Sequence, residues 1–395
     1  MTRTIGTQIR GIRAPIVKEG DDLVDIVISS LMKSSKAEGY ELKDKDVIGI
    51  TESLVARAQG NYVTVNDIAY DIEEKFGEEI GVVFPILSRN RFSIILKAVL
   101  QSSPKVYLIL SYPHDEVGNP IMNEVEMHKL GINPHSDVLS EADYRNYFGN
   151  EVKHPFTGID YLQLYTDLAI NDNISVHFSN NPKTVLQFTD NVLVADIHTR
   201  HRTKNVLKEA GAKKIYGLDD ICTAPINGSG YNPEYGLLGS NMATEDKVKL
   251  FPRDGDMFVN EIQTKLKKLT GKNIEVMIYG DGAFKDPSAK IWELADPVVS
   301  PAFTRGLCGT PSELKLKYLA DNKLSNLNGE EACGAIKKCI KEKSENLINH
   351  LEAQGTTPRQ LTDLLGSLCD LTSGSGDKGT PIILIQSYFD NFAVE

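Results

Sequence analysis

The sequence predicts a mixed α/β (α+β) fold with a central sheet, to which an inserted α/β subdomain is added. Short apolar runs typical of buried strands alternate with amphipathic stretches typical of helices, which indicates a mixed sheet. Hydrophobic residues make up 41% and charged residues 25% of the 395 residues, so the chain can bury a large core. Residues 111–220 differ in character, because they are rich in Asn, Asp, His, Tyr and Pro. We therefore interpret 111–220 as the inserted subdomain.

The individual elements follow from local patterns. The acidic pair in Gly20-Asp21-Asp22 favours the positive end of a helix dipole, so the first helix is predicted to start there, with an apolar stripe after it. Continuous apolar runs predict buried strands at 46–50, 106–110, 192–195, 213–217, 274–279 and 380–387. Further helices are predicted at 52–60, 203–211, 257–270, 330–354 and 358–371. The chain thus divides into a core (1–110, 221–300 and 355–395), the inserted subdomain (111–220) and a mainly helical segment (301–354).

The charge balance excludes several classes of protein. Lys and Arg total 43 against 54 Asp and Glu, a net charge of −11, so the chain lacks the basic surface of a general nucleic-acid binder. No stretch approaches 18 uncharged apolar residues, and residues 1–13 lack the apolar segment of a signal peptide. We therefore expect a cytoplasmic protein with neither nucleic-acid nor membrane partners.

Gly280-Asp281-Gly282 follows the predicted strand 274–279 directly. Ligands of open α/β sheets gather beyond the carboxyl ends of strands, and flanking glycines let a phosphate or metal approach the backbone. A carboxylate in this position is a natural ligand of a hard cation. An ordinary Asp-Gly turn is the alternative interpretation.

Two loops rich in small and polar residues are candidates for anion binding. The first runs Ser373-Gly374-Ser375-Gly376-Asp377-Lys378-Gly379 between a predicted helix and a predicted strand. Its consecutive backbone N–H groups can form an anion nest, with Lys378 as a point charge, although helix–loop–strand is not the order of a P-loop. The second runs from Ala224 to Asn232 and includes Asn227 and Gly230. A flexible connector and a surface loop are the alternatives.

A further candidate follows the predicted strand 192–195. Asp196 with His198 and His201 has the residue types of a metal-hydrolase site, although the two neighbouring arginines favour an anion-binding or solvated edge. The sequence contains no G-x-S-x-G and no G-x-G-x-x-G that opens an N-terminal helix, so a serine hydrolase and a dinucleotide-binding fold have no support.

Five blocks taken together, 16–23, 46–60, 224–229, 269–282 and 373–381, resemble the coenzyme F-420 gamma-glutamyl ligase family. The first, Ile16-Val17-Lys18-Glu19-Gly20-Asp21-Asp22-Leu23, is close to the opening block of that family. Asn227 stands where the family has a metal-binding aspartate, and Arg57 stands where it has a lysine. The resemblance covers about half of the chain, so this would be an enlarged and divergent member.

The resemblance implies an NTP- and divalent-metal-dependent ligase that joins a carboxylate acceptor to a glutamate-like amino acid through an acyl phosphate. It implies GTP or ATP as co-substrate, Mg²⁺ or Mn²⁺ as metal, small-molecule partners and a homodimer. The implied catalytic residues are Asp281, Arg57 and Lys378, and the implied metal ligands are Asn227, Asp281 and Gly282. The implied cofactor-binding residues are Ala14, Pro15, Ile16, Val17, Glu52, Ser53, Arg57, Gly230, Ser373, Gly374, Ser375, Gly376, Asp377, Lys378 and Gly379.

Two other functions stay open at this point. One is a metal-dependent hydrolase or phosphatase centred on Asp196, His198 and His201. The other is a non-catalytic nucleotide- or ligand-binding protein with the ligase fold, for which Asn227 in place of an aspartate is the main indication.

Overall fold

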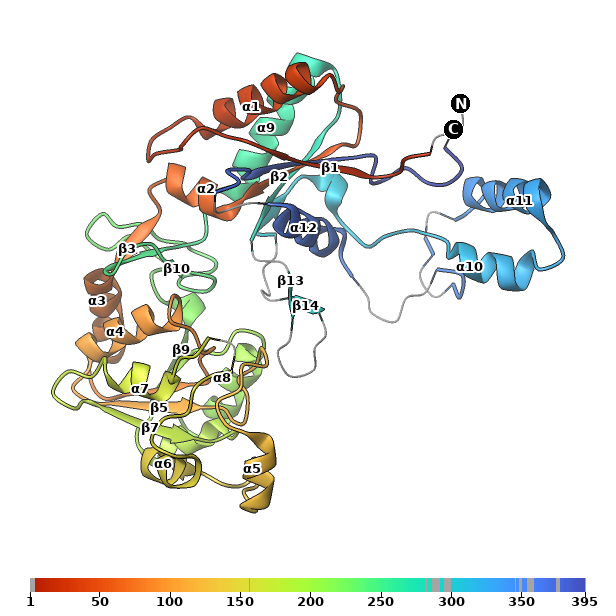
Figure 1. Ribbon diagram of the computed structural model, residues 1–395. Coiled ribbons are helices and arrows are strands. Elements are labelled where there is room, and N and C mark those ends of the chain that lie inside the picture. Colours follow the sequence, from red (N-terminus) through yellow and green to blue (C-terminus); the bar gives the residue numbers. More distant parts are fainter. Residues whose placement is uncertain are drawn as a thin grey trace.

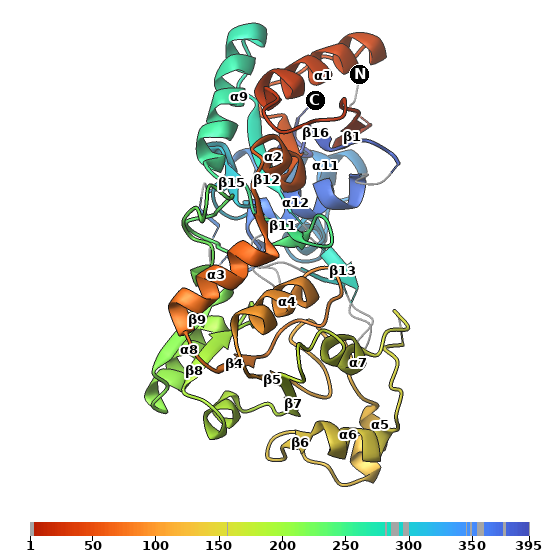
Figure 2. The same ribbon diagram turned by 90° about the vertical axis from the view of Figure 1, so that its left-hand side faces the viewer.

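The computed structural model contains two units, each built around one sheet, with a short three-stranded sheet between them (Figures 1 and 2). It describes residues 4–155, 157–280, 283–285, 292–294, 300–344, 346–347, 350–353, 359–373 and 377–394. The mixture of helices with parallel and antiparallel strands confirms the predicted fold class.

The first unit contains a five-stranded sheet in the order β1-β16-β2-β12-β15. Its strands are β1 Gln8–Ile12, β2 Val47–Thr51, β12 Glu275–Tyr279, β15 Ala302–Phe303 and β16 Ile382–Gln386. β2 and β12 are parallel, whereas the other pairs are antiparallel. The carboxyl ends of β1, β2 and β12 and the amino end of β16 therefore meet at one edge of the sheet, which we call the carboxyl edge.

Helices cover both faces of this sheet. α1 Leu23–Glu38 and α9 Gly255–Thr270 pack on one face, and α12 Leu361–Thr372 packs on the other. The first helix begins as predicted, because the Asp22 side chain accepts a hydrogen bond from the Asp25 N–H and caps it. Gly49 lets α12 approach closely, since a Cβ at this position would collide with Cys369 Sγ.

The second unit contains a six-stranded sheet in the order β6-β7-β5-β4-β8-β9. All pairs are parallel except that of the short edge strand β6 with β7. The strands are β4 Ile80–Val83, β5 Val106–Leu110, β6 Leu139–Ser140, β7 Ile174–Phe178, β8 Asn191–Val194 and β9 Lys214–Gly217. From β4 the chain moves outward to β5 and β7, then crosses back to β8 and β9, which is the topology of a doubly wound sheet.

Both faces of the six-stranded sheet are also buried. α3 and α4 lie over one face with the larger apolar cluster, whereas Leu207 of α8 and Val185 belong to the cluster on the other face. The helices are α3 Val65–Phe76, α4 Phe92–Ser102, α5 Glu124–Lys129, α6 Glu141–Phe148, α7 Tyr161–Thr166 and α8 Arg200–Glu209, with 3₁₀ turns Pro182–Gln187 and Leu218–Asp220. Burial on both faces explains why these strands are continuous apolar runs.

The predicted boundary between residues 110 and 111 passes through this sheet. β4 and β5 come from the segment assigned to the core, yet they pair with β7 and β8. The sequence pattern did not reveal this, because a buried parallel strand has the same apolar signature in either sheet. The division of the chain into domains otherwise stays a prediction.

The two units are connected by paired strands. The chain leaves the first unit through β3 Tyr62–Thr64 and returns through β11 Lys247–Lys249, and these two strands pair antiparallel, with β10 Asn241–Met242 beside β11. The Val65 N–H also donates to the Asp246 carbonyl (2.9 Å). The points at which the chain enters and leaves the six-stranded unit are therefore neighbours.

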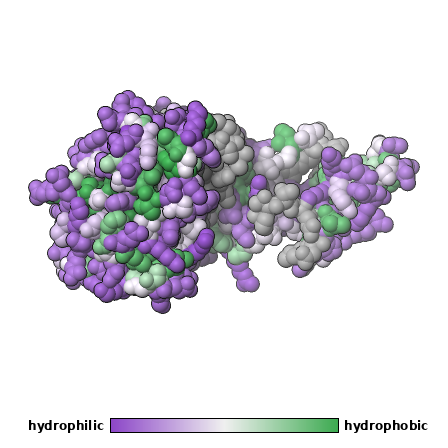
Figure 3. Space-filling view, turned by 90° about the horizontal axis from the view of Figure 1, so that it is seen from below, coloured by the Kyte–Doolittle hydropathy of each residue, from purple (hydrophilic) through white to green (hydrophobic). Residues whose placement is uncertain are grey.

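An arm of short helices extends to one side of the first unit (Figures 1 and 3). It contains α10 Leu316–Tyr318, the π-helical turn Leu319–Lys323 and α11 Gly329–Lys341. The prediction of one helix over 330–354 is wrong beyond Lys341, where α11 ends. The apolar stripe stops there, because the positions three and four residues after Ile340 are Lys343 and Ser344.

The remaining described elements are α2 Glu52–Ala58, the hairpin β13 Ala283–Lys285 with β14 Trp292–Leu294, and the 3₁₀ turn Arg305–Leu307. None of the described helices is long and apolar enough to cross a bilayer.

Candidate active site at the carboxyl edge of the five-stranded sheet

Several predicted segments meet at the carboxyl edge. Tyr279, the last residue of β12, pairs with Thr51, the last residue of β2, so Gly280 and Glu52 follow neighbouring strand ends. The Thr51 N–H donates to the Pro381 carbonyl (3.1 Å), and the Ala14 N–H donates to the Gly379 carbonyl (3.4 Å). The opening turn, the start of α2 and the end of the 373–379 loop thus lie together, although the loop is far from the other two in sequence.

A buried ion pair lies beside this edge. Lys249, the last residue of β11, donates from Nζ to Glu52 Oε1 (2.8 Å) and to the Ser53 hydroxyl. Lys249 and Glu52 are each only 9% exposed. Burying two charges is costly unless they are paired with good geometry, so this pair links the start of α2 firmly to the strand that returns from the six-stranded unit.

Asn61 holds the backbone around this pair. Its side chain, fully buried, donates to the Phe251 carbonyl (2.6 Å) and accepts from the Tyr231 N–H (2.9 Å) and from Arg253 (2.5 Å). The Arg253 guanidinium also lies over the Tyr231 ring, 4.9 Å from its centroid. One amide therefore joins three chain segments, which fixes the position of β11 and hence of Lys249.

The predicted loop 224–232 packs against the same segment. The Gly230 N–H donates to the Tyr62 carbonyl (2.8 Å), and a Cβ on Gly230 would lie 2.5 Å from the Tyr62 nitrogen. Asn227 is at the exposed tip of this loop, with a left-handed backbone (φ 50°) that glycine and asparagine tolerate best. The structure thus brings Gly230 close to β3, whereas a metal-binding role for Asn227 stays a prediction.

Replacing Gly230 by alanine is expected to lower the free energy of unfolding by about 1–3 kcal/mol, because the new methyl group meets backbone atoms that cannot rotate away. Urea denaturation measures this. Gly334→Ala is the control: Gly334 lies exposed in α11 with open space around it, so alanine there is expected to be neutral or stabilising. Equal midpoints for Gly230→Ala and the parent protein would show that the loop does not pack as described.

The opening turn lies next to the end of α2. The Gly20 N–H donates to the Ala58 carbonyl (2.9 Å), and Val17 is buried whereas Ile16 is 83% exposed. Arg57, in the last turn of α2, is exposed. Burial raises the pKa of the Tyr62 hydroxyl, and the charges of Arg57 and Glu19 both act on it, so the two side chains lie near this ring.

Some predicted residues lie outside the described part of the chain. These are Asp281, Gly282, Gly374, Ser375 and Gly376, so their roles stay predictions. Asp377, Lys378 and Gly379 are described, and all three are exposed. Within the described ranges, no three His, Cys, Asp or Glu side chains gather in a way that would hold a metal ion.

The second predicted cluster does not assemble as a metal site. Asp196 is buried, and its Oδ2 accepts the hydroxyl hydrogens of Thr199 (2.6 Å) and Thr203 (2.8 Å) at the start of α8. His198 and His201 are exposed, and neither joins Asp196 in a metal-holding group of described residues. The described residues do not support the alternative of a hydrolase metal centre there, which stays a prediction, and Asp196 Oδ2 instead stabilises the beginning of α8.

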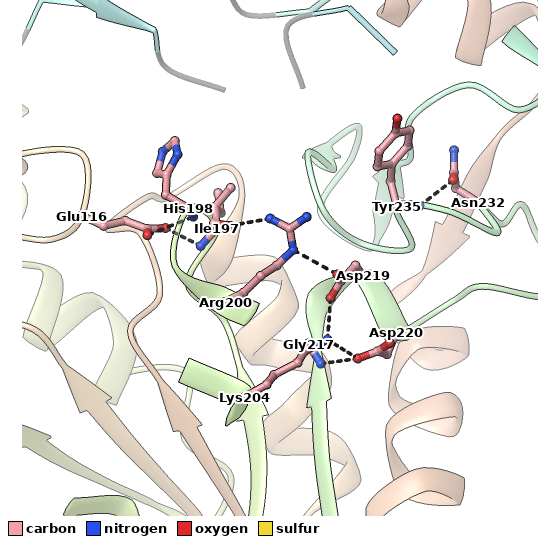
Figure 4. A network of polar contacts seen from close by, with 10 residues as sticks. All are labelled: Glu116, Ile197, His198, Arg200, Lys204, Gly217, Asp219, Asp220, Asn232 and Tyr235. Carbon is pink, nitrogen blue, oxygen red and sulfur yellow. Dashed lines mark hydrogen bonds and ion pairs between the residues drawn. The ribbon is translucent and has the colours of Figure 1, made fainter. Parts of the chain in front are cut away.

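Glu116 and a chain of ion pairs surround this segment (Figure 4). The Glu116 carboxylate accepts from the N–H groups of Ile197 and His198, and Arg200 pairs with Asp219 (3.0 Å). Burial, reinforced by the charge of Asp196, raises the pKa of Glu116 to about 7. The segment after β8 is therefore held in place by hydrogen bonds and ion pairs to other parts of the chain.

Lys249 is the residue that the sequence analysis missed. Its signal was a lysine enclosed by Val248 and Leu250 within a short apolar run that ends in Phe251. Lysine is almost never buried without a partner, so such a position indicates an ion pair. The partner, Glu52, is 197 residues away and could not be chosen from the sequence.

Comparison with known proteins assigns the chain to a family. The family model described as F420-0:Gamma-glutamyl ligase matches residues 11–387, from β1 to just beyond β16. The chain belongs to this family. The earlier resemblance, drawn from five short blocks, is thereby confirmed.

Two curated relatives are similar to the chain over short stretches. The coenzyme F420:L-glutamate ligase of Methanothermobacter thermautotrophicus is 33% identical over 92 residues, which is 22% of this chain and 35% of that protein. The coenzyme F420:L-glutamate ligase of Methanosarcina acetivorans is 31% identical over 84 residues, 20% of this chain and 30% of that protein. The chain thus spans about a third of the length of these curated relatives in the matched segments.

Proposed function

We propose that this protein is an NTP- and divalent-metal-dependent ligase that forms a gamma-glutamyl-type amide bond between a carboxylate acceptor and an amino acid. The observation that carries the proposal is the carboxyl edge. There, the opening turn, Glu52 and Ser53, Lys249 and the end of the 373–379 loop lie together in a chain that belongs to the ligase family. The names of the relatives suggest coenzyme F420 and L-glutamate as the first substrates to test.

The chemistry requires an activated carboxylate. A carboxylate oxygen attacks the γ-phosphorus of the NTP, the γ–β bridging bond breaks, and an acyl phosphate and NDP form. The neutral amine of the amino acid then attacks the acyl carbon, phosphate leaves, and the amine loses a proton. Phosphoryl transfer demands mainly positioning and neutralisation of charge from the protein. Lys249 would supply a fixed positive charge at the strand ends, and Arg57 and Lys378 would supply exposed ones.

The oxygen donors at the edge suit a hard cation. A magnesium–nucleotide complex takes only one or two carboxylates from the protein and its other ligands from phosphate and water. Glu52, at the end of β2, is a buried carboxylate in this position, and Asp281 follows Gly280 directly in the sequence. A bound Mg²⁺ or Mn²⁺ would neutralise phosphate charge there, with Glu52 and Asp281 as its ligands and Asn227 as a neutral oxygen donor.

Incubation of the purified protein with coenzyme F420, L-glutamate, GTP and Mg²⁺ or Mn²⁺ tests the proposal. We expect NDP and phosphate to form only when both acceptor and amino acid are present, and the acceptor to gain the mass of one glutamyl residue. ATP in place of GTP distinguishes the nucleotides. Phosphate release without an amide product would indicate a hydrolase instead, and nucleotide binding without turnover would indicate a non-catalytic member.

We also propose a homodimer, as the family resemblance implies. The arm of α10 and α11 extends to one side of the first unit, which leaves its surface available to a second copy (Figure 1). Light scattering at micromolar concentration should give twice the mass of the 395-residue chain, and a monomer would contradict the proposal.

A further inference from the structure

The six-stranded unit has a feature that the proposed ligation does not use. Its strand order reverses between β4 and β8, and in doubly wound sheets ligands bind in the crevice outside the carboxyl ends of the strands at such a point. The loop after β4 leads into α4, and the loop after β8 leads into α8.

A small pocket lies at this point. Its walls come from both loops and from the segments after β9 and before β10, and they include Ile86, Phe92, Ala195, Leu218 and Leu237. The pocket offers about 40 Å³ to the centres of water molecules, which is room for a group of a few non-hydrogen atoms. Its walls are mainly apolar, so a short aliphatic group fits it.

Three polar residues also line the pocket: Ser88, Arg91 and Ser240. Ser240 is 3% exposed, and its buried hydroxyl has no hydrogen-bond partner among the described residues. A buried hydroxyl without a partner costs free energy, and a ligand atom in the pocket would relieve that cost. Arg91, at the start of α4, is the one charged residue among the pocket's described lining.

The chain itself blocks the two places where a nucleotide phosphate would bind. In the loop after β4, the Ser88 hydroxyl already accepts from the N–H groups of Arg91 (3.1 Å) and Phe92 (2.8 Å). In the loop after β8, the Glu116 carboxylate accepts from Ile197 and from His198 (3.1 Å), as Figure 4 shows. The segment 84–92 also contains no glycine that would let a phosphate approach the backbone.

We infer that this pocket is a second ligand site, which binds a small monocarboxylate with an apolar body. The apolar body lies between Phe92, Leu218 and Leu237, and the carboxylate pairs with Arg91 and accepts from the Ser240 hydroxyl. A guanidinium and a hydroxyl together match a carboxylate in charge and in hydrogen-bonding capacity. The site is separate from the Glu52–Lys249 pair and does not depend on the proposed ligation.

Ligand-observed NMR titration of the full chain with isobutyrate and isovalerate tests this site. We expect saturable binding in the millimolar range or tighter, and no comparable binding of isovaleramide, which has the same shape without the charge. Inorganic phosphate and GMP distinguish the alternatives. Displacement of isovalerate by either, or equal binding of isovaleramide, would overturn the inference, as would the absence of binding by both carboxylates.

Substitutions of residues that line the pocket test whether the carboxylate binds there. Arg91→Gln should weaken isovalerate binding by at least about tenfold, whereas Arg89→Gln, an exposed position two residues away that does not line the pocket, should leave it unchanged. Ser240→Ala should weaken binding about three- to tenfold without lowering the melting temperature, because it removes an unsatisfied buried hydroxyl. Unchanged affinity in both Arg91→Gln and Ser240→Ala would overturn the assignment.

Discussion

A Lys249→Met variant is expected to lose about 3–5 kcal/mol of unfolding free energy and the proposed ligase activity. The substitution keeps the length of the side chain but leaves the Glu52 carboxylate, 9% exposed, without its ammonium partner. Removing one member of a buried pair is costly because the other charge stays desolvated. Urea denaturation gives the stability, and the amide-forming assay gives the activity.

Two further variants make this result specific. Lys247→Met lies on the same strand with an exposed side chain, so its stability should change by no more than about 0.5 kcal/mol. Adding Glu52→Gln to Lys249→Met should recover part of the lost stability, because the uncompensated charge is removed, but it should not recover activity. If Lys249→Met is as stable as Lys247→Met, the ion pair does not form in solution.

An Asp281→Asn variant is expected to lower NTP-dependent ligation by at least about a hundredfold and to change the melting temperature little. Asp281 follows the buried strand β12 and is flanked by Gly280 and Gly282, and the family resemblance implies that Asn227 stands where a second aspartate is expected. Asp281 would therefore carry much of the charge that binds the metal. The assay and a thermal melt on the same preparation separate the two effects.

The exposed Asp256, in the first turn of α9, provides the matched control, and Asp256→Asn should keep the parent rate. Asn227→Asp should tighten Mn²⁺ binding in calorimetry if the 224–232 loop faces the same ion. Near-normal turnover of Asp281→Asn together with unchanged Mn²⁺ affinity of Asn227→Asp would place the metal elsewhere.

The elements that were predicted each have a strong local signal, whereas others, such as α3, α4, β4 and β7, were not predicted. The run Val106–Leu110 was predicted residue for residue, and α1 begins after its acidic cap. Local signals do not specify which strands pair with each other. β2 pairs in parallel with β12, which lies more than 200 residues later in the sequence. Neither strand has a sequence feature that identifies the other as its partner. The placement of the predicted domain boundary at residues 110 and 111, between β5 and its neighbour β7, has the same cause.

The residues of the candidate site show the same limit: those within a recognisable sequence block were predicted, and those placed only by the fold were not. Glu52 and Ser53 were found because the family resemblance points to their block, and Gly230 because its loop resembles another. Lys249 lies outside all five blocks, and only the fold brings it to Glu52. Asp196 is a different case: its residue type suggested a metal ligand, and in the structure its Oδ2 accepts from two threonine hydroxyls, whereas its buried Oδ1 has no hydrogen-bond partner among the described residues.

The pairing of β3 with β11 has a consequence for how such a chain can arise. Val65 and Asp246 are joined by a backbone hydrogen bond, so everything between them leaves and rejoins the first unit at one spot. Inserting a segment whose two ends are already adjacent leaves the geometry of its host unchanged, since no gap has to be spanned. A smaller ancestral enzyme could therefore have acquired the six-stranded unit in one genetic event while keeping its own sheet intact. The descent of the two units can then differ, and each can be traced separately.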